Sequence, residues 1–164
     1  MTDAVLVSIT IVPDEVRGDE LRARIASARA TAHHSVSHTR GMSAIACSEA
    51  RVGIDLEAVR PRVMLDRLAR RSMTDAELAS FAAGPVGDRD ERFAQHWTRV
   101  EAYLKAIGEG VRAGLRTRPP TGWSVLDLDL LAPHVGAIAV EATEVVVSVD
   151  RLSGAFTEHP GTSG

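Results

Sequence analysis

Cysteine is nearly missing from this chain, with one residue, Cys47, among 164. A single cysteine excludes an intrachain disulfide framework and is typical of a reducing compartment. Cys47 ends the apolar run Ala44, Ile45 and Ala46, so we expect it to be a small, buried hydrophobic side chain.

Long apolar runs and an excess of charge of one sign are also missing. No stretch approaches the roughly 20 apolar residues of a membrane-spanning helix, and the N-terminus lacks the pattern of a signal peptide. The formal net charge of −3 argues against general binding to nucleic acid. We therefore expect a cytoplasmic protein that has neither a membrane nor a nucleic acid as a partner.

What remains is an ordinary globular composition with alternating strand and helix patterns. Strands are predicted at residues 4–12, 42–48, 52–57, 123–130, 135–140 and 143–149, and helices at residues 18–32, 63–69, 74–81 and 90–107. We expect an α+β fold, in which a mostly antiparallel sheet packs against the long helix 90–107. The strands 42–48 and 51–57 are expected to form a hairpin.

The chain is expected to hold one domain and a tail. Residues 1–152 would form the domain, with a small N-terminal lobe at 1–36 and the motifs in 37–152. Residues 153–164 are polar and contain glycine and proline, so a flexible tail is predicted there.

Two carboxylates interrupt the apolar strand VGIDLE at residues 52–57. Side chains alternate faces along a strand, so one face is apolar and the other carries Gly53, Asp55 and Glu57. Adjacent carboxylates repel each other unless a cation lies between them, and Mg²⁺ prefers such oxygen ligands. The spacing alone also fits a solvated strand face with no chemical role.

The long helix contains a second pair of charges. Glu101 and Lys105 are four residues apart, so they lie one turn from each other, beside an apolar stripe that includes Trp97, Val100 and Leu104. They fit either an exposed ion pair or a third carboxylate with a phosphate-binding lysine.

The order of SHTRGMSAIACSEARVGIDLE, TDAEL and FAQHWTRVEAYLKAIGEGV resembles the surfactin-type phosphopantetheinyl transferase family. The resemblance covers roughly residues 34–115. It implies transfer of the phosphopantetheine arm of coenzyme A to a serine of an acyl or peptidyl carrier protein. Coenzyme A and a carrier protein would be the partners, and Mg²⁺ would be the cofactor.

The resemblance also implies roles for individual residues. Asp55, Glu57 and Glu101 match the acids that hold Mg²⁺, and Glu101 is in addition a candidate base for the carrier serine. Lys105 matches the lysine that meets the phosphates. By the same matching, the coenzyme A phosphates are also contacted by Ser37 and His38.

Two of the departures of this sequence from the family pattern concern the long helix and the N-terminal part. Val100 stands where the family usually has lysine, and about 36 residues precede the Ser-His pair, fewer than in typical members. The first departure favours packing for Val100 and the second suggests a shortened N-terminal lobe. A monomer is compatible with this lobe, as is a homodimer in which a neighbour supplies a missing wall.

Two other functions are compatible with parts of the pattern. A transferase-like protein that has lost or changed the reaction could act as a binding protein, or as a pathway enzyme on a biosynthetic intermediate. A metal-dependent nuclease could also combine D-x-E with Glu and Lys, but such sites usually place the latter pair two apart on a strand. Here Glu101 and Lys105 are four apart on a predicted helix, which disfavours the nuclease.

Overall fold

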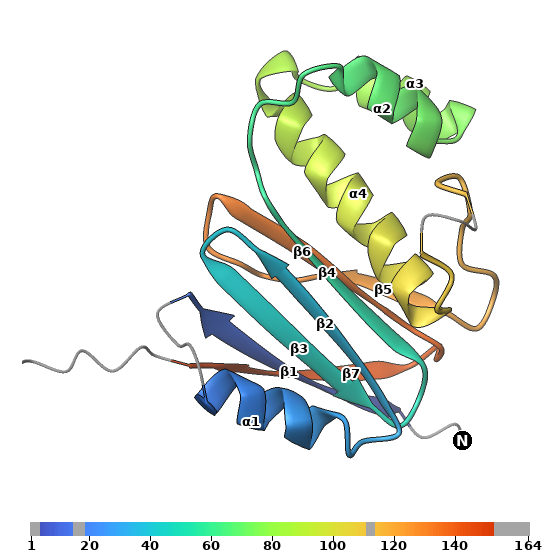
Figure 1. The fold of residues 1–164 in the computed structure, drawn as a ribbon. Helices are drawn as coiled ribbons and strands as arrows, with labels where there is room; N and C mark the ends of the chain where they lie inside the picture. Colours follow the sequence, from blue (N-terminus) through green and yellow to red (C-terminus); the bar gives the residue numbers. More distant parts are fainter. Residues whose placement is uncertain (1–3, 15–18, 111–113, 153–164) are drawn as a thin grey trace, which may run out of the picture.

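The computed structural model describes residues 4–14, 19–110 and 114–152, and in them the chain forms two sheets (Figure 1). The first sheet has the strand order β2-β3-β1-β7 and the second has the order β4-β6-β5. The first contains β1 (Val5–Pro13), β2 (His33–Thr39), β3 (Met42–Ser48) and β7 (Val145–Arg151), and the second contains β4 (Val52–Ala58), β5 (Ser124–Asp127) and β6 (His134–Val140). All pairings are antiparallel except that of β1 with β7. The predicted α+β fold is therefore confirmed.

The predicted hairpin between β3 and β4 is wrong. Both edges of β3 are occupied, one by β1 and one by β2, so β3 has no free edge for the strand that follows it. β4 pairs instead with β6, which lies about 80 residues later in the chain. Local patterns reveal strands but not such distant partners.

A row of side-chain hydroxyl groups joins the two sheets where β2 meets β4. Three residues of β2, spaced two apart, accept hydrogen bonds from the backbone of β4. The pairs are Ser35 Oγ with Ile54 N at 3.1 Å, Ser37 Oγ with Leu56 N at 3.1 Å, and Thr39 Oγ1 with Ala58 N at 3.0 Å. We call this row the hydroxyl ladder. It supplies hydrogen-bond acceptors for backbone N–H groups on the edge of β4 that faces away from β6, where unpaired N–H groups would be costly.

The main core lies between the two sheets. Alternate side chains of β1, β3, β4 and β6 point into it, as the period of two requires. The buried side chains of this core are Val7, Ile9, Ile11, Ala44, Ala46, Val52, Ile54, Leu56, Ile138 and Val140. Cys47 alternates with Ala46 and faces the other side of β3, where it is partly exposed near the N-terminal helix. The prediction that Cys47 is buried is therefore wrong.

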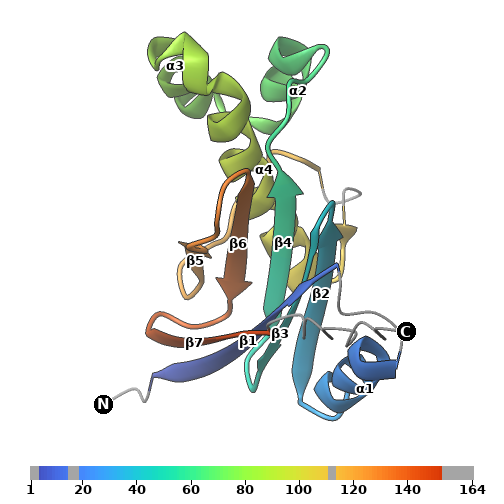
Figure 2. The ribbon, with the colours of Figure 1, turned by 90° about the vertical axis from the view of Figure 1, so that its left-hand side faces the viewer.

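The longest helix, α4 (Arg89–Ala106), crosses β4 and β6 on the face opposite the main core (Figure 1). Two shorter helices, α2 (Leu65–Ser72) and α3 (Asp75–Ala83), pack around its N-terminal half (Figure 2). The helix predicted at residues 74–81 is observed as α3, which begins with a capping box formed by Thr74 and Glu77. After α4, Gly108 and Gly110 take positive φ angles of 73° and 54°, as a glycine-terminated helix predicts.

The remaining elements are α1 (Asp19–Ala28), which contacts β3 from the outer side of the first sheet, and the short 3₁₀ turn η1 (Val86–Asp88). Within the described residues no helix is both long enough and apolar enough to cross a membrane. The predicted tail at 153–164 lies outside the described residues.

Candidate active site

Gly53 allows helix α4 to lie directly on strand β4. A Cβ atom at this position would be 2.0 Å from the carbonyl oxygen of Ala102 and 2.6 Å from the backbone nitrogen of Ala106, distances that no packed side chain tolerates. Asp55 and Glu57 share this face of β4 with Gly53. The strand thus directs its two carboxylates toward α4, while its apolar face is buried in the core.

Lys105 reaches from α4 across to β4 and to the hydroxyl ladder. Its ammonium group lies 2.7 Å from Asp55 Oδ1, 3.1 Å from the carbonyl oxygen of Ile54 and 3.1 Å from Ser37 Oγ. An ammonium group has three N–H donors. All three donors of Lys105 are therefore occupied by the protein itself.

Ser37 is buried and makes three hydrogen bonds at this junction. Its hydroxyl group donates to Asp55 Oδ1 at 3.1 Å and accepts from Lys105 Nζ and from the backbone N–H of Leu56. One donor and two acceptor sites are the full capacity of a hydroxyl group. Ser37 thus holds together the strand, the carboxylate and the ammonium group.

Asp55 is 7% exposed, and this burial is the main cause of the shift in its pKa. Burial raises the pKa of this carboxyl, and the nearby Lys105 and the hydrogen bond from Ser37 only partly oppose the rise. Desolvation disfavours the charged form even when an ion pair is present.

Glu101 stands one turn before Lys105 on α4 and is partly buried. The pKa of its carboxyl is raised, first by burial and then by the negative charges of Asp55 and Glu57, while Lys105 opposes the rise. The three carboxylates therefore share one electrostatic environment, although Asp55 and Glu101 are separated by 46 residues of sequence.

Glu57 is paired with an arginine that the sequence analysis did not identify. Arg62 Nη2 lies 3.2 Å from Glu57 Oε2, and the two side chains are 15% and 22% exposed. Arg62 follows Pro61 in a segment without strand or helix periodicity, so only its positive charge close to an acidic motif could have drawn attention to it.

The donor set can be compared with the needs of Mg²⁺. Carboxylate oxygens are suitable ligands, and the pKa of Glu101 is raised by burial and, in smaller part, by repulsion from Asp55 and Glu57 that a divalent cation would relieve. Within the described residues no three potential ligand side chains are gathered around one point, since Lys105 and Arg62 hold the acids of β4. The chemistry of Asp55, Glu57 and Glu101 fits the ion, and their present rotamers do not enclose it.

The other predicted residues lie at different places around this site. His38 is exposed and alternates with Ser37 on β2, so it faces away from Asp55. Val100 is 4% exposed and packs within the fold, which confirms its predicted packing role. The helix thus presents no cation at the position before Glu101.

Two acids on a strand that face an acid and a lysine on a long helix form the pattern noted in the sequence. A profile of the 4′-phosphopantetheinyl transferase superfamily matches residues 51–153. The chain therefore belongs to this superfamily.

Three relatives carry matching names. The chain is 33% identical over 121 residues to the 4′-phosphopantetheinyl transferase HetI of a Nostoc species, a match that covers 65% of the chain and 50% of that protein. It is 33% identical over 82 residues to the putative 4′-phosphopantetheinyl transferase slr0495 of a Synechocystis species, covering 49% of the chain and 33% of the relative. It is 29% identical over 83 residues to the 4′-phosphopantetheinyl transferase psf-1 of Bacillus pumilus, covering 51% and 35%. The chain thus spans about half the length of HetI.

Proposed function

We propose that this protein transfers the phosphopantetheine arm of coenzyme A to a serine of an acyl or peptidyl carrier protein, with Mg²⁺ as cofactor. We place it in the surfactin-type branch because of the order of its motifs. The observation that carries the proposal is the meeting of Asp55 and Lys105 at 2.7 Å, with Glu57 and Glu101 in the same electrostatic environment.

The reaction forms a bond between the serine oxygen and the phosphorus that bears the pantetheine arm. The bond from that phosphorus to the bridging oxygen breaks, and adenosine 3′,5′-bisphosphate leaves with that oxygen. Phosphoryl transfer depends mainly on alignment and on charge stabilisation. When bound by Asp55, Glu57 and Glu101, Mg²⁺ would neutralise charge on the diphosphate oxygens.

Glu101 is the residue to which we assign the serine proton. A carboxylate on a rigid helix can accept this proton when the serine hydroxyl comes within hydrogen-bond reach of it. Lys105 and Ser37 hold Asp55 in place, and their hydrogen bonds fix the carboxylate relative to Glu101.

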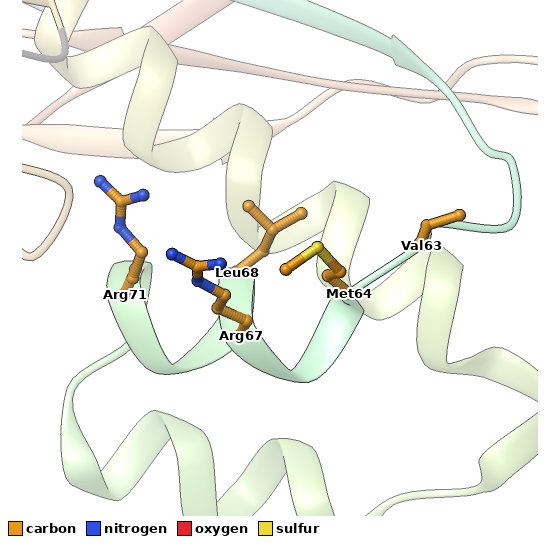
Figure 3. Close-up of a pocket in the computed structure, with 5 residues that line it drawn as sticks. All are labelled: Val63, Met64, Arg67, Leu68 and Arg71. Atoms are coloured by element: carbon orange, nitrogen blue, oxygen red, sulfur yellow. The ribbon is translucent and has the colours of Figure 1, made fainter.

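The groove beside α2 is a suitable docking surface for the carrier protein. It has a volume of about 300 Å³ and is lined by Val63, Met64, Arg67, Leu68 and Arg71 (Figure 3). Val63 is 89% exposed and Met64 is 55% exposed, beside two arginines one turn apart. We propose that it binds a carrier surface with acidic and apolar side chains, because charge complementarity directs such contacts.

The transfer is tested by the gain in mass of a carrier serine after incubation with coenzyme A and Mg²⁺, across several acyl and peptidyl carriers. Replacement of Glu101 by glutamine should slow the transfer by about a hundredfold or more. Glu91→Gln, an exposed acid on the same helix, is the matched control and should transfer at the wild-type rate. No transfer by the wild type to any carrier, or an unchanged rate in Glu101→Gln, would contradict the proposal.

The docking surface is tested separately with Arg67→Glu/Arg71→Glu. We expect the KM for the carrier to rise by roughly tenfold, whereas the affinity for coenzyme A stays unchanged. Arg29→Glu reverses an exposed charge at the end of α1 and is the control. An unchanged carrier KM in the double variant would exclude this surface.

A further inference from the structure

Arg62 holds a guanidinium group in the interior beside the candidate site. Its side chain is 15% exposed, and its guanidinium carbon lies 5.3 Å from the ring centre of Phe93. The backbone N–H of Arg62 donates to Asp90 Oδ1 at 3.0 Å. The backbone contact with Asp90 fixes the base of the side chain, while the guanidinium group stacks on Phe93 and meets Glu57.

The hydrogen-bond donors of Arg62 are only partly used. Nε and Nη2 are buried and have no hydrogen-bond partner among the described residues. Nη2 is 3.2 Å from Glu57 Oε2, so the contact is an ion pair without the geometry of a hydrogen bond. The fork of an arginine normally binds a carboxylate or phosphate with two parallel hydrogen bonds, and here Glu57 does not complete that arrangement.

Lys105 presents the opposite case. Its three donors are occupied by Ser37, Ile54 and Asp55, so it would have to break internal hydrogen bonds to bind a phosphate. Arg62, in contrast, would gain hydrogen bonds by binding a phosphate. Of Lys105 and Arg62, it is therefore Arg62 whose hydrogen-bond donors are available for an anionic ligand.

Buried donors without partners are uncommon in folded proteins, and they point to a missing ligand or to a functional role. A guanidinium group with unused hydrogen-bond donors is suited to a diphosphate, whose oxygens accept several hydrogen bonds at once. Because Val100 is buried and apolar, α4 offers no cation directly before Glu101, and Arg62 supplies a positive charge from another segment.

We propose that Arg62 is a diphosphate-binding residue, which neutralises Glu57 in the free protein and turns to the diphosphate of coenzyme A when it binds. This inference rests on the proposed function, since that function supplies the diphosphate. The exchange leaves Glu57 free at the moment when the ligand arrives. Arg62 thus competes with a divalent cation for Glu57 in the free protein and supports the anionic ligand in the complex.

This exchange predicts opposite effects on two binding constants. Arg62→Gln should weaken the binding of coenzyme A, measured by calorimetry with Mg²⁺ present, by about tenfold or more because charge-assisted hydrogen bonds are lost. The same variant should bind Mn²⁺ several-fold more tightly without coenzyme A, measured by electron paramagnetic resonance, because Glu57 is released. Arg60→Gln removes an exposed charge two residues away and should change either constant less than threefold.

Arg62→Lys provides a second variant if the glutamine protein does not fold. It keeps the charge without the planar fork, so both constants should move in the same directions by smaller factors. Unchanged coenzyme A binding in the Arg62 variants, or Mn²⁺ binding that is unchanged or weaker, would overturn the inference. If the wild type transfers the arm while Arg62→Gln binds coenzyme A normally, only the role of Arg62 is wrong. If the wild type neither binds coenzyme A nor transfers, the proposed function is wrong as well.

Discussion

Replacement of Ser37 by alanine removes one hydroxyl group that serves three partners. The hydroxyl accepts from the backbone N–H of Leu56 and from Lys105 Nζ, and it donates to Asp55 Oδ1. Ser35, two residues earlier in the hydroxyl ladder, accepts from the backbone N–H of Ile54 and is less deeply buried. The pair Ser37→Ala and Ser35→Ala therefore compares the same kind of backbone hydrogen bond with and without the site.

The expected loss of stability can be estimated from these contacts. Ser37→Ala leaves the buried N–H of Leu56 unpaired, which costs about 1–3 kcal/mol. The hydrogen bonds to Lys105 and Asp55 add roughly 1 kcal/mol, because these two charges keep each other at 2.7 Å. We expect a loss of about 3 kcal/mol for Ser37→Ala and of about 1 kcal/mol for Ser35→Ala, because Ser35 is only partly buried and water can replace its hydroxyl group.

Urea unfolding at pH 7, followed by circular dichroism, measures both differences if the slope of the free energy with urea is unchanged. The transfer assay then shows whether Ser37 also positions the groups of the candidate site. Ser37→Ala should lower kcat, whereas Ser35→Ala should leave kcat close to the wild-type value. Equal losses of stability in the two variants, together with an unchanged kcat in Ser37→Ala, would refute the role of Ser37 at the junction.

Three further predictions follow from the packing and the charges. Gly53→Ala should destabilise the fold by about 3 kcal/mol or more in urea unfolding, because its Cβ would collide with α4, whereas Gly87→Ala, with no atom within 4 Å of its Cβ, should change stability by less than about 0.5 kcal/mol. Lys105→Met should lower the free energy of unfolding by about 3 kcal/mol at pH 7, because it leaves a buried carboxylate without its counter-charge. A loss of stability below about 1 kcal/mol would contradict this. Arg118 lowers the pKa of Glu77 to about 2 from 4.5, so this ion pair stabilises the protein above pH 4.5 and its contribution disappears as the pH falls toward 2. Solvent screening limits it to about 1 kcal/mol, and a Glu77→Gln variant with the same acid unfolding curve as the wild type would refute it.

The part of the site that depends on local periodicity could be predicted from the sequence. The alternation in VGIDLE separates an apolar face from Asp55 and Glu57, and in the structure one face enters the core and the other meets α4. The interval of four between Glu101 and Lys105 places them one turn apart on α4. Hydrophobic periodicity does not predict which helix packs on which face of a strand. That expectation came from the family resemblance.

The hydroxyl ladder escaped prediction for a physical reason. The strand β2 reads HHSVSHT, and its inward positions Ser35, Ser37 and Thr39 are polar, so no apolar alternation marks it. Their role is to pair with the free edge of β4, which is a partnership between side chains and backbone. Hydrophobic patterns respond to burial in a core and not to this kind of junction.

Arg62 was missed because a single cation after a proline has no spacing rule. Its importance arises from two contacts that the fold creates, one with Glu57 on β4 and one with Phe93 on α4. Both partners lie in different elements from Arg62. Side chains that join separate elements are the ones that local sequence reasoning cannot rank.

The hydroxyl of Ser37 belongs to both the junction between the sheets and the candidate site, which couples stability to chemistry. The apolar face of β4 is buried in the core. For this reason β4 cannot rotate to keep Asp55 near Lys105 if β2 shifts. A slip of one residue would replace Ser37 by an outward-facing neighbour and break all three of its hydrogen bonds. Strand register therefore sets the position of Asp55 and helix α4 sets that of Lys105, so neither depends on a loop. This is the rigid support that a site for phosphoryl transfer requires.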